Sequence, residues 1–231
     1  MNKVPVVTID GPSGSGKGTV SRAAARALGW SLLDSGALYR LVALAGRQAG
    51  VSLDDAPGLA RLAQAADIAF GSSSSGQEVV WLDGKDVTGA IRTEEAGNDA
   101  SRVAALPGVR TALLERQRRF AVPPGLVADG RDMGTVVFPG AEVKIFLTAS
   151  AAERALRRHK QLKEKGVAAN LAALSLEIAE RDLRDSTRAA SPLVASADAV
   201  LLDTTGMSID AVVERVLEVA RGRLSLRSLS K

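Results

Sequence analysis

The residues best suited to chemistry lie near the start of the chain, in the run Gly11-Pro12-Ser13-Gly14-Ser15-Gly16-Lys17-Gly18-Thr19. An apolar run from Val6 to Ile9 precedes it, and an Ala-rich segment with helical spacing follows it to about Leu28. A glycine-rich turn between a strand and a helix presents backbone N–H groups to phosphate oxygens. Lys17 adds a flexible positive charge for the β- and γ-phosphates of a nucleotide. We therefore predict a phosphate-binding loop over this run.

The loop departs from the common nucleotide-binding pattern at one position. Gly18 follows Lys17 where a serine or threonine usually supplies a hydroxyl ligand to Mg²⁺, and the hydroxyl of Thr19 comes one residue later. We expect Mg²⁺ to accompany the nucleotide and to be held mainly by water and phosphate oxygens, which suits this strongly hydrated ion. We therefore name no residue of the chain as a metal ligand. The Gly-Lys-Gly-Thr ending is similar to that of nucleoside monophosphate kinases rather than to that of switch GTPases.

A second polar cluster follows the apolar strand that we predict at residues 126–128. It contains Asp129, Arg131 and Asp132. A carboxylate at the end of a strand is the usual partner of a phosphate-binding loop, because it organises Mg²⁺ and its water. We expect Asp129 to act near the metal, and Arg131 and Asp132 to point at an acceptor molecule.

The short apolar run at residues 30–33 predicts a buried strand of a parallel sheet, and polar residues follow it. Ser35 and Arg40 would lie at the edge where open α/β sheets bind ligands. A helix cap and a solvated arginine would explain the same two residues. Ser101 and Arg110, further along the chain, are by themselves typical of a helix surface.

Arginines concentrate in two predicted helices, at about residues 152–165 and 171–184, which are joined by a short turn at Gly166. On each helix their spacing places them on one face. They are Arg154, Arg157 and Arg158 on the first helix, and Arg181, Arg184 and Arg188, with Asp185, on the second. Ion pairs with Glu177, Glu180 and Asp182 on solvated helices would explain the same pattern. Directly after a core strand, however, the two faces favour a lid, about residues 151–190, that closes over phosphates.

Strand-like runs alternate with helical segments through most of the chain, which is typical of an α/β protein with a parallel sheet. We predict five such strands, at about residues 6–9, 30–33, 126–128, 143–147 and 199–203. Between about residues 67 and 88, short strand-like runs flank Asp83-Gly84, a strong hairpin signal, and the Ser/Gly stretch 71–76, which predicts a flexible loop tip. We predict one domain with a core at residues 1–34 and 121–231 and an inserted region at about 35–120 that holds a small antiparallel sheet. After a last helix at 209–221, we expect the tail beyond Gly222 to fray.

Composition narrows the class of protein. The chain has 231 residues, 46% hydrophobic and 24% charged, and no cysteine, so disulfides and cysteine-based sites are excluded. No apolar run approaches the ~20 residues of a membrane span, and no signal segment precedes the first strand, so we expect a cytoplasmic protein. The net charge of +4 would suit a polyanion, but two Trp, one Tyr and four Phe are too few for a base-stacking surface. We attribute the positive charge to phosphate chemistry on a small substrate.

Four motifs together resemble the bacterial cytidylate kinases, a branch of the nucleoside monophosphate kinases. They are Ile9–Gly14 continuing to Thr19, Leu33–Arg40, Asp129–Pro139, and Glu180–Asp182 continuing to Arg188. The resemblance covers nearly the whole chain. It implies a P-loop kinase that transfers the ATP γ-phosphoryl group to CMP and dCMP with Mg²⁺. It also implies that the inserted region at about residues 35–120 binds the nucleoside monophosphate. We expect a monomer whose partners are the small molecules ATP and CMP or dCMP, without a nucleic-acid or membrane partner.

The resemblance further implies roles that spacing alone does not show. The expected contacts to the acceptor phosphate are Ser35, Arg40 and Arg131. The expected cytosine readers are Ser101, Arg110, Asp132 and Arg188, and the expected ribose contacts are Arg181 and Asp185. The residues expected to act on the transferring group are Lys17, Arg131, Arg157, Arg181 and Arg184.

Three alternatives stay open at this point. Another acceptor, UMP or AMP, would use the same chemistry. A GTP-binding switch would use Asp203-Thr204-Thr205-Gly206, which has the Asp-x-x-Gly spacing, but no Asn-Lys-x-Asp guanine signature occurs. A basic RNA-binding protein would need more aromatic residues than the chain contains, and salt-sensitive RNA retention would reveal it.

Overall fold

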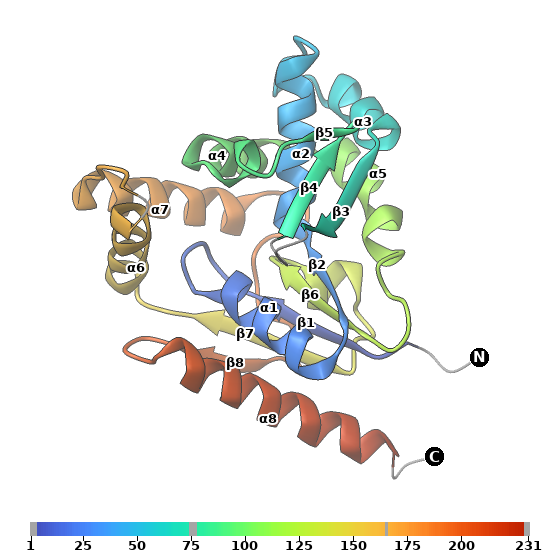
Figure 1. Ribbon diagram of the computed structural model, residues 1–231, viewed down its shortest axis with the longest axis vertical. Helices are drawn as coiled ribbons and strands as arrows, with labels where there is room; N and C mark the ends of the chain where they lie inside the picture. Colours follow the sequence, from blue (N-terminus) through green and yellow to red (C-terminus); the bar gives the residue numbers. More distant parts are fainter. Residues whose placement is uncertain (1–3, 74–77, 165, 229–231) are drawn as a thin grey trace. The chain divides into compact units, whose positions relative to one another are not determined.

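A parallel sheet forms the centre of the computed structural model, which describes residues 4–73, 78–164 and 166–228. Its strands are ordered β2-β6-β1-β7-β8 (Figure 1). Their bounds are Val6–Asp10 for β1, Ser31–Asp34 for β2, Leu126–Gly130 for β6, Val143–Thr148 for β7 and Val200–Asp203 for β8. Each neighbouring pair is parallel. The predicted five-stranded parallel sheet is therefore confirmed.

Apolar side chains on the sheet and on two helices form the main core. Every residue of β1 and β6 is buried, as expected for central strands of a parallel sheet that is covered by helices. Helices α1 (Lys17–Leu28) and α8 (Ile209–Ser228) pack against each other and against the sheet. Val7 and Ile9 point into this core, and because strand residues alternate in direction, Thr8 and Asp10 point to the opposite face.

The strand order brings several connecting segments to one edge of the sheet. β1 lies between β6 and β7, and the register pairs Ile9 with Asp129 and Asp10 with Phe146. Because the carboxyl ends of parallel strands meet at the same edge, the segments after these three strands gather there. They are the glycine-rich loop, the turn that begins at Arg131, and the start of helix α6 (Ala151–Glu164).

A helical hairpin follows β7. Helix α6 spans Ala151–Glu164 and packs against α7, which spans Leu171–Thr187 (Figure 1). Asn170 caps α7 by accepting hydrogen bonds from the backbone N–H groups of Ala172 and Ala173. The two arginine-bearing helices were predicted, and α7 continues about one turn beyond the expected residue 184.

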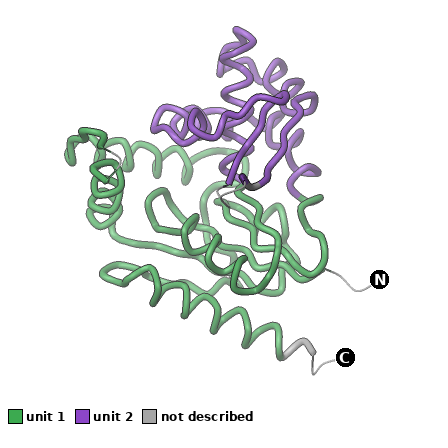
Figure 2. The backbone as a smooth tube through the Cα atoms, viewed as in Figure 1, with its two compact units in different colours: residues 1–34, 118–231 green, residues 35–117 purple. Residues whose placement is uncertain are grey.

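Residues 35–117 form a second compact unit, and residues 1–34 and 118–231 form the first (Figure 2). The second unit contains the antiparallel sheet β3-β4-β5, with strands Ile68–Ser72, Glu78–Leu82 and Lys85–Asp86. Its helices are α2 (Ser35–Gln48), α3 (Ala56–Ala65), η1 (Ala90–Arg92), α4 (Glu94–Val103) and α5 (Pro107–Arg118), the last of which runs one residue into the first unit. Asp83 and Gly84 make the predicted turn between β4 and β5, both with positive φ. Residues 74–77 of the predicted Ser/Gly loop tip lie outside the described residues.

Two local expectations were wrong. The strand after α1 was expected to be buried, but β2 is an edge strand in which only Leu33 is buried. The tail beyond Gly222 was expected to fray, but α8 continues to Ser228. Leu224 packs against the main core and the Arg223 guanidinium donates to the Asp198 carbonyl at 3.0 Å, so both residues extend the helix. Residues 229–231 of that tail lie outside the described ranges. No helix in the described ranges is long and apolar enough to span a membrane.

Candidate active site

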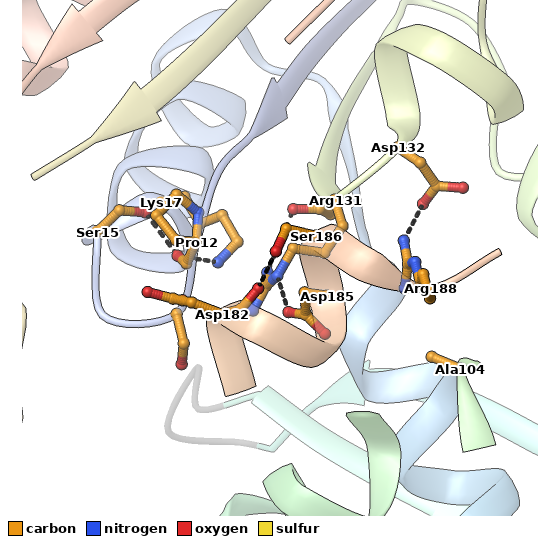
Figure 3. Close-up of polar contacts among 12 residues, drawn as sticks. Pro12, Ser15, Lys17, Ala104, Arg131, Asp132, Asp182, Asp185, Ser186 and Arg188 are labelled. Atoms are coloured by element: carbon orange, nitrogen blue, oxygen red, sulfur yellow. Dashed lines mark hydrogen bonds and ion pairs between the residues drawn. The ribbon is translucent and has the colours of Figure 1, made fainter. Parts of the chain in front are cut away.

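The predicted phosphate-binding loop follows β1, and two of its side chains donate hydrogen bonds to a backbone carbonyl of the same loop. The Ser15 hydroxyl and the Lys17 ammonium group both donate to the Pro12 carbonyl at 3.0 Å (Figure 3). Gly11 has a φ of +153°, and a Cβ at this position would lie 2.1 Å from the Leu147 carbonyl oxygen of β7. Only glycine allows this close approach. Helix α1 then begins at Lys17, with its N-terminus next to the loop.

Lys17 is buried, and its pKa is lower than that of an ordinary lysine. Burial, together with the positive charges of Arg131 and Arg181, lowers the pKa of Lys17 to about 7, while Asp129 and Asp185 oppose the change. An anion in the loop would favour the charged ammonium form. The positive charges around Lys17 are not fully compensated by neighbouring carboxylates, so the site favours binding of an anion.

Asp129, at the end of β6, faces the loop. Burial raises the pKa of the Asp129 carboxyl to about 6, against the opposing charge of Lys17. A Cβ at Gly18 would lie 3.2 Å from Asp129 Oδ2, tighter than an ordinary contact. A side chain at position 18 would press on this carboxylate, and the glycine leaves room for it. In the described part of the chain, no group of three or more His, Cys, Asp or Glu side chains is placed to hold a metal ion.

The turn after β6 is joined to α7 by two ion pairs. Arg131 Nε donates to Asp185 Oδ2 at 2.9 Å, and Arg188 Nη2 lies 3.8 Å from Asp132 Oδ1 (Figure 3). Burial alone would raise the pKa of Asp185, but Arg131, Arg181 and Arg188 outweigh burial and lower it. The structure thus brings together five residues that were predicted separately from two distant motifs.

The backbone of this turn is held by a residue that the sequence analysis did not single out. Asp10 accepts hydrogen bonds from the N–H groups of Met133 and Gly134, each at 2.8 Å. The segment Met133–Val137 forms a single turn of π-helix, a geometry often found at functional sites. An acidic residue between an apolar strand and a glycine loop is a signal that could have been noticed.

Arg154 of helix α6 is bound to other groups of the protein through all three nitrogens of its guanidinium. Its guanidinium donates to the carbonyls of Ser13 and Ala149, each at 3.0 Å, and to Asp182 Oδ2 at 2.6 Å. The side chain is 7% exposed. Arg154 therefore connects α6 to the phosphate-binding loop and to α7, and the pairing with Asp182 is one that the ion-pair alternative anticipated.

Arg157 lies one turn further along α6 and also reaches the loop. Its Nη1 is 3.0 Å from Thr204 Oγ1 and 3.4 Å from the Ser15 carbonyl, and its Nε donates to Glu153 at 2.8 Å. Thr204, fully buried after β8, was not predicted as part of the site. Arg181 and Arg184 are half-buried on α7, and Arg158 donates to its helix neighbour Gln161.

Four predicted residues belong to the second unit, and all have defined surroundings there. Ser35, the first residue of α2, is buried and donates to Oε1 of the buried Gln117 at 2.8 Å. Arg40 Nη1 lies 3.4 Å from the Ile91 carbonyl. Ser35 is therefore more than a helix cap, and Gln117 is a partner that the sequence analysis missed.

Ser101 and Arg110 are buried, so the helix-surface interpretation is wrong for both. Ser101 lies on α4, which packs against α2. The Arg110 guanidinium lies over the Tyr39 ring, 5.6 Å from its centroid, and donates to the Ala104 carbonyl at 3.2 Å. A buried arginine held by a ring face and a carbonyl has a fixed direction, as a recognition group requires.

The fold and the first unit's site together define a P-loop kinase: a parallel sheet, a phosphate-binding loop after its central strand, and an arginine-bearing helical hairpin after the neighbouring strand. The family model for cytidylate kinase matches residues 7–222. The chain belongs to the cytidylate kinase family.

Individual relatives match over nearly their whole length. The chain is 57% identical to the cytidylate kinase of Marinomonas sp. (strain MWYL1), over 97% of this chain and 99% of the relative. It is 60% identical to that of Stutzerimonas stutzeri (strain A1501), over 95% and 97%. It is 56% identical to that of Methylococcus capsulatus, over 96% and 99%.

The switch-protein alternative loses its support. The Asp203 carboxylate is exposed and accepts hydrogen bonds from the N–H and hydroxyl groups of Thr205, at 2.9 and 2.7 Å. These bonds from Thr205 lower the pKa of Asp203. The Asp-x-x-Gly spacing thus reflects a local turn after β8.

Proposed function

We propose that the chain transfers the γ-phosphoryl group of ATP to CMP and dCMP, giving CDP or dCDP and ADP. Membership of the cytidylate kinase family supports this activity. The structural observation that carries it is the pairing of Arg131 with Asp185, whose charges both act on Lys17, together with the pairing of Asp132 with Arg188. Directed acidic and basic groups of this kind are what a phosphorylated, hydrogen-bonding acceptor requires.

The donor is held by the phosphate-binding loop. The loop amides and Lys17 bind its phosphates, and the loop residues are Gly11, Pro12, Ser13, Gly14, Ser15, Gly16, Lys17, Gly18 and Thr19. Phosphoryl transfer needs positioning and charge neutralisation more than covalent catalysis. The acceptor is already an anionic phosphate, so the reaction requires no strong general base.

The acceptor is held by groups that match its parts. Cytosine presents an amino donor beside ring-nitrogen and carbonyl acceptors, so one carboxylate and several donors can read it. The proposed readers are Asp132, Ser101, Arg110 and Arg188. The proposed phosphate contacts are Ser35, Arg40 and Arg131, and the proposed ribose contacts are Arg181 and Asp185.

The lid neutralises charge and excludes water. Arg157, Arg181 and Arg184 would surround the transferring group together with Lys17 and Arg131. Excluding water matters because water would otherwise accept the phosphoryl group in place of the nucleotide. Arg154, which is bound to Ser13, Ala149 and Asp182, holds the hairpin rather than the phosphate.

Mg²⁺ fits the residues present. Asp129 Oδ1 is buried and has no hydrogen-bond partner in the described part of the chain, so it can accept from a metal-bound water. Bound with ATP, the ion would neutralise charge on the β- and γ-phosphates. Gly18 supplies no ligand, and phosphate oxygens and water would complete the shell. A cytoplasmic location and a monomeric state complete the proposal.

A coupled assay with ATP and Mg²⁺ that compares CMP, dCMP, UMP and AMP tests the proposed function. We expect CMP and dCMP to be phosphorylated with the highest kcat/KM. Lys17→Ala and Arg131→Ala should lose turnover while their circular dichroism spectra stay native. A higher kcat/KM for UMP or AMP, or near-normal activity of either variant, would overturn the assignment.

A further inference from the structure

Asp10 is a buried carboxylate that the proposed chemistry does not use. It is the last residue of β1, directly before the phosphate-binding loop, and is 5% exposed. No cation pairs with it in the described part of the chain, and burial raises the pKa of Asp10 to about 7. Burying a carboxylate without a cationic partner is costly, so its hydrogen bonds identify what it does.

Both oxygens of Asp10 hold the turn that carries the acceptor-side residues. Oδ1 accepts from Met133 N–H and Oδ2 from Gly134 N–H, each at 2.8 Å. These amides come directly after Asp132, and the chain then enters the π-helical turn. The two bonds therefore fix the backbone from which the Asp132 side chain projects.

The packing of Gly134 shows how closely the turn lies against the sheet. A Cβ at this position would lie 3.0 Å from Thr8 Oγ1, 3.2 Å from Lys144 Cδ and 3.4 Å from Asp10 Oδ2. The absence of a side chain lets the amide of residue 134 approach the carboxylate. Asp132 itself is buried and lies 3.8 Å from Arg188, so a small rotation of the turn would misplace it.

We propose that Asp10 is a positioning residue: its carboxylate holds the Met133 and Gly134 amides and thereby sets the direction in which Asp132 faces the acceptor base. This inference rests on the proposed function, in which Asp132 reads cytosine. Base selection thus depends on the residue that directly precedes the donor loop. Its effect falls on the choice of acceptor rather than on ATP binding.

Asp10→Asn is the informative substitution. Asparagine has nearly the same shape, but only its carbonyl oxygen accepts, and its amide hydrogens would face a second N–H donor. An unsatisfied buried donor is costly, and we expect about a tenfold rise in the KM for CMP. The ratio of kcat/KM for CMP to that for UMP should fall by about the same factor, with the KM for ATP within about twofold of wild type.

Two further variants make the test specific. Thr8→Val is the matched control, because Thr8 is a buried residue of the same strand that also lies against the turn, but its hydroxyl is 3.5 Å from the Val143 carbonyl and hydrogen-bonds neither amide. It should leave acceptor selection unchanged. Gly134→Ala should push the turn away from Asp10 without altering the carboxylate, and should lower selectivity for CMP as Asp10→Asn does. It replaces Asp10→Asn in the test if that variant does not fold.

A double-mutant cycle with Asp132→Ala decides whether Asp10 acts through Asp132. We expect Asp10→Asn to change the CMP-to-UMP ratio in the wild-type background and to leave it unchanged once Asp132 is absent. Additive effects, or equal rises in the KM values for CMP and ATP, would overturn the proposal. If the wild type itself prefers another monophosphate, the proposed function fails. The same comparison, made with that preferred acceptor, still decides whether Asp10 positions Asp132.

Discussion

At the scale of single residues, burial and neighbouring charges shift the pKa values of the groups in the site. Lys17 is the clearest case, because burial and two arginines lower its pKa to about 7. Bound phosphates favour the ammonium form. ATP binding above this pH must therefore take up a proton, and affinity should fall as the pH rises.

We expect the dissociation constant for ATP to rise by up to about tenfold per pH unit between about pH 7 and pH 9, the limit for uptake of one proton. Calorimetry in buffers of different ionisation enthalpy should show the uptake directly. Lys17→Arg is the control, because a guanidinium stays charged across this range. Equal pH slopes for the wild type and the variant would exclude the explanation.

At the scale of elements, the hairpin of α6 and α7 is attached to the phosphate-binding loop through side chains of α6. Arg154 makes three hydrogen bonds, to the loop, to the end of β7 and to α7. Arg154→Lys keeps the charge but cannot reproduce this fork of donors. We expect faster amide exchange in α6 and α7, and more ATP hydrolysis relative to transfer, because a looser lid admits water.

Lys160→Ala, an exposed substitution on the same helix, controls for effects on α6 itself. Each charge-assisted bond contributes about 1.5–3 kcal/mol, so Arg154→Lys should also lower the melting temperature of the protein. Unchanged exchange in α7 would show that Arg154 does not connect the two helices.

The same elements show what local sequence can and cannot reveal. The loop, the hairpin at Asp83-Gly84 and the two arginine-bearing helices were predictable, because strand runs, turn residues and helical spacing are local signals. The partners of Arg154 and Asp10 were not, since Ser13 is 141 residues from Arg154, and Met133 is 123 residues from Asp10. The edge position of β2 and the full length of α8 likewise depend on tertiary packing.

At the scale of the whole molecule, the first unit is discontinuous in sequence. The chain leaves the first unit after β2 and returns to it at residue 118, shortly before β6. The paired strands β2 and β6 are therefore separated in the sequence by the whole of the second unit. The Asp10 contacts with Met133 and Gly134 likewise connect the two parts of the first unit. The free energy of unfolding of the first unit should therefore depend on whether Asp10 is ionised.

Burial raises the pKa of Asp10 from an ordinary 3.8 to about 7 in the folded chain. Between these values the folded state binds a proton that the unfolded state has lost. The free energy of unfolding should therefore decrease as the pH rises from about 4 to about 7, by at most about 1.4 kcal/mol per pH unit for one proton. Asp10→Asn removes this titration, so its stability should fall less steeply.

Denaturant unfolding of wild type and Asp10→Asn at several pH values measures the difference between their slopes. The variant should be most destabilised relative to wild type at about pH 4 and below, where the Asp10 carboxyl is protonated in both the folded and the unfolded wild type, and the difference should shrink as the pH approaches 8. Asp210→Asn, an exposed carboxylate in the first turn of α8, is the control and should leave the slope near that of wild type. Parallel curves for wild type and Asp10→Asn would show that Asp10 is already ionised in the folded protein at acidic pH. Its two backbone hydrogen bonds would then outweigh the cost of its burial.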